Sequence, residues 1–321
     1  MKKAIAAAMV ILLLCSAMAG CGQKKEEGGP SGEWTPITVT DDLGREVTLE
    51  TKPEKAAILL GSFAETWILA GGDICATVHD SWDDYDLDLD ETVVKNLGSH
   101  GSISMELLFE AKPDIIIASA NTKAQVELLG TFEKTGIPIL YFSVNSFEDY
   151  MRMMEISTKI TGRDDLYKQN ALDVKERVDA ILARAAAAVE KNGAPKVLFI
   201  RASAKTVQAK GSSDTVTGFI LKDLGAVNIA DGSDLTDNLS IEKIIVEDPE
   251  FIFVVLQGDD QEGAKKALED ELTGNPAWAG LTAVKEGRVY FLPKDLYHFK
   301  PNARWDESYE GVCDILYPEE N

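Results

Sequence analysis

Short apolar runs alternate with amphipathic stretches along most of the chain. Four runs in its first half have the length and composition of buried strands: KAAILLG at 55–61, ICATV at 74–78, PDIIIAS at 113–119 and IPILYFSVNS at 137–146. The stretches 62–72 and 124–136 between them predict helices, the second ending at a glycine cap. Strands that alternate with helices predict a mainly parallel sheet in an α/β lobe. Ahead of them, residues 37–50 alternate around an Asp-Leu-Gly turn and predict a β-hairpin.

The alternation stops between residues 163 and 192. A single apolar stripe runs through this stretch and predicts one long helix: Tyr167, Ala171, Val174, Val178, Ile181, Ala185 and Ala188. The first pattern then returns, with strands predicted over 196–203, 250–257 and 287–295, helices over 215–225 and 264–274, and a last helix over 301–316 with Pro301 in its first turn. The predicted fold class is α/β, with two Rossmann-like lobes (35–162 and 193–321) and mainly parallel sheets, joined by one long rigid helix (163–192).

The N-terminal segment MKKAIAAAMVILLLCSAMAGC combines two lysines, an apolar stretch and small residues, which predicts a secretory signal over residues 1–20. Residues 18–21 resemble a bacterial lipobox, so Cys21 is predicted to carry lipid; the alternative is cleavage near Ala19 with Cys21 unmodified. Residues 21–34 are charged and glycine-rich and predict a flexible tether. We therefore expect a body anchored by lipid on the outer face of the bacterial cytoplasmic membrane. Cys75 and Cys313 are expected to be buried free thiols, although they could pair in an oxidising compartment.

Charge and motifs exclude several classes of function. The 321 residues include 32 Lys and Arg against 54 Asp and Glu, a net charge of -22, which disfavours a nucleic-acid partner because phosphate binding needs a basic face. The sequence contains no Gly-x-Ser-x-Gly, phosphate-loop or His-Glu-x-x-His motif. We therefore predict a monomeric binding protein, not an enzyme, that uses no cofactor.

Polar, aromatic and basic residues collect where the predicted strands end. Because ligands of open α/β sheets bind beyond the carboxyl ends of the strands, these segments form the candidate site. The candidate ligand-binding residues are Ser62, Phe63, Trp82, His100, Ser102, Asn121, Asn145, Arg201, Lys205, Lys210, Tyr297, His298 and Arg304. His100, which lies in the loop GSHGS, is the strongest candidate from the first lobe. We expect it to line one groove together with Asn121, Arg201 and His298.

The residues alone leave the ligand open. One group could meet an anionic carboxylate or catecholate: Arg201, Lys205, Lys210 and Arg304. Alternatively, Tyr297 or His298 could ligate a haem iron.

Two other classes of function compete with a receptor for such a chelate. The first is a receptor for a bare transition-metal ion bound by His79, His100 and His298, for which zinc is the better match. The second is a lipid-anchored hydrolase or adhesion domain. The lack of a nucleophile–base motif weighs against a hydrolase.

Three segments carry a resemblance to a known family: VTDDLGREVTL, GSHGSISMELLFEAKPDIIIAS and LSIEKIIVEDPEFIFVV. The two longer segments, one in each predicted lobe, share a polar loop, a glutamate that opens a helix, and a Pro-acidic step before a hydrophobic strand. With the lipobox and the long helix, residues 37–317 resemble the substrate-binding lipoproteins of ABC importers for iron-siderophores, haem and cobalamin, the class III periplasmic binding proteins.

This resemblance implies that the ligand lies in the groove between two lobes and that the partners are a permease and its ATPase. It also implies that one exposed glutamate per lobe, Glu106 and Glu242, docks on arginines of the permease. Each glutamate would in addition favour the start of its own helix through the helix dipole. Since a long helix resists bending, only modest closure of the lobes is expected.

Overall fold

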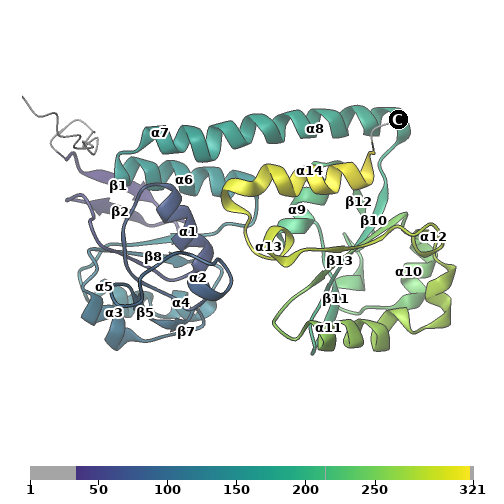
Figure 1. Cartoon of the computed structure of the whole chain (residues 1–321), viewed down its shortest axis with the longest axis horizontal. Coiled ribbons are helices and arrows are strands. Elements are labelled where there is room, and N and C mark those ends of the chain that lie inside the picture. The colour runs from purple at the N-terminus through teal and green to yellow at the C-terminus, as the bar shows by residue number, and fades with distance from the viewer. Residues whose placement is uncertain (1–33, 214, 319–321) are drawn as a thin grey trace, which may run out of the picture. The chain divides into compact units, whose positions relative to one another are not determined.

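Two separate five-stranded sheets organise the residues that the computed structural model describes, 34–213 and 215–318 (Figure 1). In the first sheet all neighbouring strands are parallel, in the order β5 (Lys95–Asn96), β4 (Ile74–Thr77), β3 (Ala56–Ile58), β8 (Ile115–Ser119) and β9 (Ile139–Phe142). In the second sheet only one pair is antiparallel, β11 (Val207–Ala209) on β10 (Lys196–Ala202). The parallel strands there are β10, β12 (Val227–Asn228), β13 (Phe251–Leu256) and β14 (Val289–Leu292). The predicted α/β class with mainly parallel sheets is confirmed.

The predicted hairpin is also present, as β1 (Ile37–Thr40) paired with β2 (Glu46–Leu49). Its turn is organised by Asp41, whose carboxylate accepts hydrogen bonds from the backbone amides of Leu43 at 3.1 Å and Arg45 at 3.0 Å. Gly44 adopts a φ of 76°, a conformation that favours glycine. The Asp41 carboxylate also binds the Arg45 guanidinium at 2.6 Å, which fixes the hairpin to its own turn.

Helices follow the strands in both lobes. In the first lobe these are α1 (Gly61–Leu69), α2 (Asp80–Asp83), α3 (Met105–Ala111), α4 (Lys123–Glu127), α5 (Leu129–Glu133) and α6 (Phe147–Thr161), with a small hairpin of β6 (Gly98–Ser99) and β7 (Ser102–Ile103). In the second lobe they are α9 (Val216–Asp223), α10 (Ile241–Glu247), α11 (Gln261–Leu268), α12 (Thr282–Lys285), α13 (Lys294–Tyr297) and α14 (Trp305–Leu316). Short 3-10 and π segments complete this lobe: η2 (Asp234–Thr236), η3 (Glu269–Thr273), η4 (Pro276–Gly280) and η5 (Asn302–Arg304). Each lobe has its own buried core beneath its sheet.

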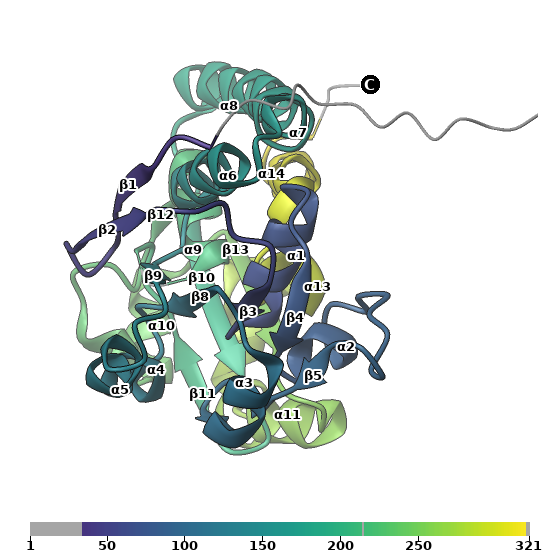
Figure 2. The ribbon, with the colours of Figure 1, turned by 90° about the vertical axis from the view of Figure 1, so that its left-hand side faces the viewer.

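The long helix between the two sheets is continuous but not uniform. It comprises α7 (Asp164–Tyr167), a π-helical segment η1 (Lys168–Leu172) and α8 (Asp173–Asn192). Five residues of its predicted stripe are buried: Ala171, Val174, Val178, Ile181 and Ala185. α8 packs along α14, where Arg184 pairs with Glu310 at 3.0 Å and Asp314 at 2.8 Å, and α6 lies beside them (Figures 1 and 2). The long helix is thus fastened to the last helix of the chain.

Three details differ from the sequence prediction. The predicted helix over 124–136 is split at Leu128 into α4 and α5, and Gly130 is the second residue of α5. The last helix begins at Trp305 rather than Pro301, because Asn302 has a left-handed φ of 52° that a regular helix does not admit. The pattern also failed to predict α6, although Ser146 and Asp149 form a capping box at its start.

Some expectations concern residues that the structure does not describe, and others concern the two cysteines of the folded part. The predicted signal, the lipidation site Cys21 and the tether up to residue 33 lie outside the described residues. Cys75 and Cys313 are free thiols, the second buried and the first partly buried. Burial raises the pKa of Cys75 to about 11 and so makes its thiol unreactive at neutral pH. Among residues 34–213 and 215–318, no helix is long and apolar enough to span a bilayer.

Candidate functional site: the strand ends

The segment that follows β14 joins the two lobes next to the predicted site. Lys294 Nζ lies 3.5 Å from Asp84 Oδ1, and the backbone amide of Lys300 donates to Tyr85 Oη at 3.2 Å. The rings of Tyr85 and Phe299 lie 5.6 Å apart. Residues beyond the ends of β4 and β14 are therefore in direct contact, which is the arrangement that the strand-end argument requires.

Asn302 makes a second connection between the lobes, and it is buried. Its side-chain amide donates to the carbonyl of Ser62 at 3.0 Å and to Glu65 Oε2 at 2.5 Å. Thr66 Oγ1 donates to Asn302 Oδ1 at 3.2 Å. Burial raises the pKa of Glu65, although the bond from Asn302 opposes this. One residue of η5 thus contacts three residues of α1: Ser62, Glu65 and Thr66.

Three basic side chains gather at this junction. Arg201, at the end of β10, has a buried Nε with no hydrogen-bond partner among the described residues, and burial lowers its pKa. Burial and the neighbouring Arg201 and Lys300 charges lower the pKa of His298 to about 4. Burial also lowers the pKa of Lys300 to about 8, while Asp80 acts in the opposite direction. At neutral pH the group therefore comprises two cations and a neutral imidazole, and an anion would relieve their desolvation.

Aromatic rings flank these cations. Lys300 Nζ lies 5.9 Å from the centre of the Phe63 ring, within the range of a cation–π contact. Phe63 packs edge-on against Phe142 at 6.3 Å, and Phe299 packs against His298 at 5.4 Å. Phe63 and Phe142 are buried, so only the partly buried Phe299 offers apolar ring surface beside the positive charge. Such a surface suits a ligand that has both aromatic and anionic parts.

His100 reaches this region from the first lobe. Its Nδ1 lies 3.7 Å from Asp80 Oδ1, and the other oxygen of Asp80 accepts the Gly61 amide at 3.0 Å. Burial alone would raise the pKa of Asp80, but the contacts with His100 and Gly61 outweigh it and lower the pKa, while Asp80 raises the pKa of His100. A β-carbon at Gly61 would lie only 3.0 Å from the backbone of Asp80 and Ser81, so glycine permits this close approach.

The buried side chain of Gln125 fixes the His100 loop to the sheet. Its Nε2 donates to the carbonyls of Leu59 at 2.6 Å and His100 at 3.1 Å, and its Oε1 accepts the Ser119 amide at 2.7 Å. Three strand-end segments are therefore held by one amide. Gln125 was not among the predicted site residues, and a polar residue inside an otherwise ordinary amphipathic helix gave little signal.

Asn121 and Asn145 form a second polar group in the same lobe. Asn121 Nδ2 donates to Asn145 Oδ1 at 3.2 Å, and Ser143 Oγ donates to Asn121 Oδ1 at 3.0 Å. These side chains follow β8 and β9, which are adjacent parallel strands. These hydrogen bonds use only part of the donors and acceptors of the two side-chain amides, and the rest are available to a ligand.

The other predicted residues have different surroundings. Buried Tyr297 donates its hydroxyl to the carbonyl of Ser308 at 3.0 Å, and Trp82 donates its indole N–H to the carbonyl of Leu89 at 3.0 Å. Arg304 pairs with Glu307 at 2.9 Å and with Asp295 at 3.3 Å on the surface. Ser62 is buried within α1, Ser102 and Lys205 are exposed, and Lys210 lies partly buried after β11. The contacts described for Tyr297, Trp82 and Arg304 are directed away from the group around Arg201, Lys300 and His100.

The histidines do not form a metal site. His79 Nε2 pairs with Asp83 at 2.6 Å on the surface, whereas His100 pairs with Asp80. Across residues 34–213 and 215–318, no three His, Cys, Asp or Glu side chains are grouped so that they could hold a metal ion. The alternative of a bare metal ion bound by His79, His100 and His298 therefore has no support.

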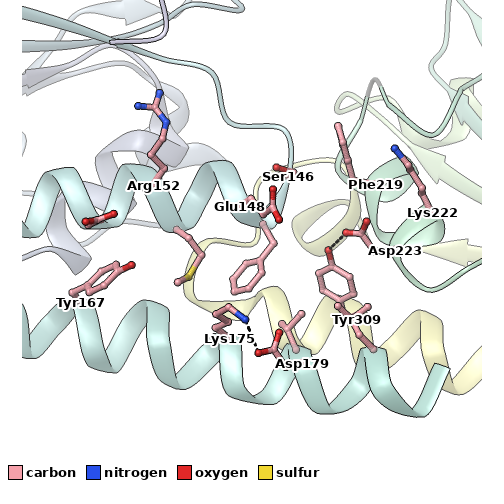
Figure 3. A pocket seen from close by; sticks show the side chains of 15 residues that line it. Ser146, Glu148, Arg152, Tyr167, Lys175, Asp179, Phe219, Lys222, Asp223 and Tyr309 are labelled. Atoms are coloured by element: carbon pink, nitrogen blue, oxygen red, sulfur yellow. Dashed lines mark hydrogen bonds and ion pairs between the residues drawn. The ribbon is translucent and has the colours of Figure 1, made fainter. Parts of the chain in front are cut away.

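A cavity of about 630 Å³ lies among helices rather than at the strand ends (Figure 3). Side chains of α6, α8, α9 and α14 line it, and several of its polar groups are mutually paired. Tyr309 donates to Asp223 at 2.6 Å, and Lys175 pairs with Asp179 at 2.5 Å. No predicted ligand-binding residue is among those that line this cavity. We therefore place the candidate site at the strand ends.

The relation to known proteins agrees with this geometry. Residues 57–296 match the family of periplasmic binding proteins. The chain belongs to this family. A periplasmic binding protein binds and delivers a solute and is not an enzyme, so the predictions of the family and of a non-catalytic role are confirmed.

Curated relatives align with this periplasmic binding protein over nearly its whole length. An uncharacterised ABC transporter substrate-binding lipoprotein, YvrC of Bacillus subtilis, is 25% identical and covers 99% of both chains. The Fe(3+)-citrate-binding protein YfmC of the same organism is 24% identical and covers 92% of this chain and 91% of its own. The name lipoprotein agrees with the predicted lipid anchor in the cell envelope.

Solved structures share the fold of this periplasmic binding protein. The siderophore-binding protein BauB, bound to acinetobactin and ferric iron, has a TM-score of 0.70 at 21% identity and covers 89% of this chain and all of its own. A periplasmic haem-binding protein from Pseudomonas aeruginosa has a TM-score of 0.67 at 21% identity, covering 84% and 94%. The vitamin B12-binding protein BtuF of Vibrio cholerae has a TM-score of 0.65 at 21% identity, covering 83% and 97%.

Proposed function

We propose that this protein is the substrate-binding component of an ABC importer and that it captures an anionic ferric chelate of the siderophore type between its lobes. The group of Arg201, Lys300 and His298 carries the proposal. Two cations are held partly out of water there, and the buried Nε of Arg201 has no hydrogen-bond partner within residues 34–213 and 215–318. A carboxylate or catecholate of a ferric chelate would supply charge-assisted hydrogen bonds to these groups.

The aromatic residues and the known relatives support the same ligand class. The partly buried ring of Phe299, which has Lys294 Nζ 5.1 Å from its centre and Lys300 as its neighbour in the chain, offers a face on which a catecholate or other flat group can stack. The relative YfmC is named for ferric citrate, and BauB binds a ferric siderophore. Haem and cobalamin are the competing ligands. The hydroxyl of Tyr297 is buried and donates to the carbonyl of Ser308, which argues against haem ligation by this residue.

Delivery requires a partner in the membrane. Glu106 lies exposed in the first turn of α3, and Glu242 lies exposed in the first turn of α10. Ser240 Oγ donates to Glu242 at 2.8 Å, and hydrogen bonds lower the pKa of Glu242. Both carboxylates are thus available to basic side chains of a permease that works with an ATPase, as in other importers of this kind.

A ligand panel tests the proposal. Purified protein is heated with ferric citrate, a ferric catecholate, haem or cyanocobalamin, because a ligand that binds only the folded state raises the unfolding temperature. We expect one of the ferric chelates to raise it and the Arg201→Ala variant to lose this effect. Lys205→Ala is the matched control, since Lys205 is an exposed cation on the loop that follows the same strand. Stabilisation by haem or cobalamin alone, or equal responses of both variants, would refute the assignment.

A further inference from the structure

The two glutamates lie on helices that repeat one another in detail. α3 and α10 each contain seven residues, and each begins at a serine, Ser104 or Ser240, whose hydroxyl accepts the backbone amide three positions later at 3.3 or 3.4 Å. Each helix ends at a residue in the left-handed conformation, Lys112 with a φ of 50° and Asp248 with a φ of 43°. A proline and a buried strand follow in both cases. Corresponding positions of the two helices can therefore be compared directly.

An exposed apolar side chain occupies the same position in both helices. Phe109 is 43% exposed and Ile245 is 40% exposed, and each lies three residues after its glutamate, on the same helix face. Val246, the next residue of α10, is 82% exposed. Eight large hydrophobic side chains are exposed in the described part of the chain, and these two short helices carry three of them. Such a concentration next to charged residues is typical of a protein interface.

A hollow adjoins the same part of each helix. Beside α10 a cavity of about 250 Å³ is lined by Glu242, Val246 and Glu247 among others. Beside α3 a cavity of about 460 Å³ is lined by Glu110 and Ala111, which correspond in position to Val246 and Glu247. The exposed carboxylate and the exposed apolar side chain thus occur together once in each lobe. Glu242 itself lines the hollow beside α10, whereas the hollow beside α3 adjoins only the end of that helix.

We propose that Phe109 in α3 and Ile245 with Val246 in α10 are apolar contact residues for the permease, acting beside Glu106 and Glu242. The occupant that fits is a membrane protein with two equivalent halves, because the same surface is present twice on one chain. Each half would present a basic side chain to the glutamate and an apolar patch to the residue one turn later. This inference rests on the proposed function and adds to it a contact that salt does not screen.

The salt dependence of docking separates the contribution of the apolar side chains from that of the glutamates. Purified permease–ATPase complexes of the source organism, in lipid nanodiscs, are screened for one whose ATP hydrolysis the wild-type protein stimulates. The concentration of binding protein that gives half-maximal stimulation of ATP hydrolysis is then measured for two double variants. One combines Phe109→Ser with Ile245→Ser, and the other combines Glu106→Gln with Glu242→Gln. We expect the apolar pair to raise it by about fivefold or more per side chain at both low and high salt. The glutamate pair should raise it mainly at low salt, because salt screens exposed charges.

Leu172→Ser is the matched control, because Leu172 is also 43% exposed but lies on the long helix. Ligand-induced stabilisation is measured on each variant to show that the groove is intact. If the wild-type protein stimulates a complex and the Phe109/Ile245 variant does so at an unchanged concentration, the inference is wrong while the proposed function stands. If the wild-type protein stimulates none of the complexes, the proposed function is itself refuted and the inference with it.

Discussion

Lys300 should reduce the stability of the folded protein, and its replacement by methionine should reveal by how much. The pKa of Lys300 falls from 10.5 to about 8 because its ammonium is buried, although Asp80 acts in the opposite direction. A shift of this size corresponds to about 3 kcal/mol at neutral pH, an upper value since part of the side chain still reaches water. Methionine retains most of the apolar stem that packs near Phe63 and removes the charge.

The predicted gain depends on pH in a defined direction. Below about pH 8 Lys300 is protonated in both the folded and the unfolded chain, so the full unfavourable energy of its buried charge is present. Above pH 10.5 it is neutral in both states, and that energy vanishes. Lys300→Met should therefore raise the unfolding temperature at pH 7 by about 6 °C, and the gain should shrink toward zero between pH 8 and 10.5.

Thermal and urea unfolding at pH 7 and pH 10 measure this difference, with Lys205→Met as the exposed control. The same variant should bind an anionic ferric chelate more weakly, because it lacks one of the two cations. A variant that is less stable than the wild type at pH 7, or a gain in stability that does not depend on pH, would show that the charged ammonium of Lys300 does not destabilise the folded protein. The argument for an anionic ligand would then lose its main support.

Four further predictions concern other parts of the protein. Cys21→Ala should move the protein from the membrane fraction to the soluble export fraction on cell fractionation; continued membrane association would contradict lipid anchoring. Replacing both Glu106 and Glu242 by lysine should abolish uptake of labelled ligand in cells while the purified protein keeps its ligand affinity; normal uptake would disprove docking through these residues. His100→Ala should weaken binding of an anionic chelate more at pH 6 than at pH 8 in titration calorimetry, because Asp80 raises the pKa of His100 and the imidazole is charged at the lower pH; equal losses would exclude a charged role. Asn302→Ala should lower the free energy of unfolding by about 2–3 kcal/mol in urea titrations, since buried partners on α1 lose their hydrogen bonds; Asn302→Gly, which relieves the left-handed backbone, should lose less.

The sequence predicted the fold well because apolar periodicity reports burial directly. Every predicted strand from KAAILLG to GRVYFLPKD contains a strand of one of the two sheets. The helix α6 escaped notice because its residues are on average neither apolar nor polar, and only the cap at Ser146 and Asp149 marks its start. Short pairing strands such as β5 and β11 depend on their partners and give almost no pattern of their own.

The site was harder to predict, because neighbouring residues in one loop can have opposite surroundings. Tyr297 and His298 are adjacent, yet the tyrosine is buried against Ser308 while the imidazole shares its surroundings with Arg201. Lys300 was not predicted although its segment was identified, since only its contacts with the other lobe distinguish it. Positions at strand ends follow from the strand pattern of the sequence, whereas surroundings that depend on tertiary contacts leave no such pattern.

The buried connection at Asn302 has a consequence for the rate at which ligand is exchanged. Because its amide bridges the lobes and is excluded from water, the lobes cannot swing widely apart without leaving Ser62 and Glu65 without their partner. We therefore expect that bound ligand leaves slowly and that the residence time in solution is long compared with the time between encounters with the membrane. Release would then be timed by the permease, whose proposed binding to both lobes at once could supply the work of separating them.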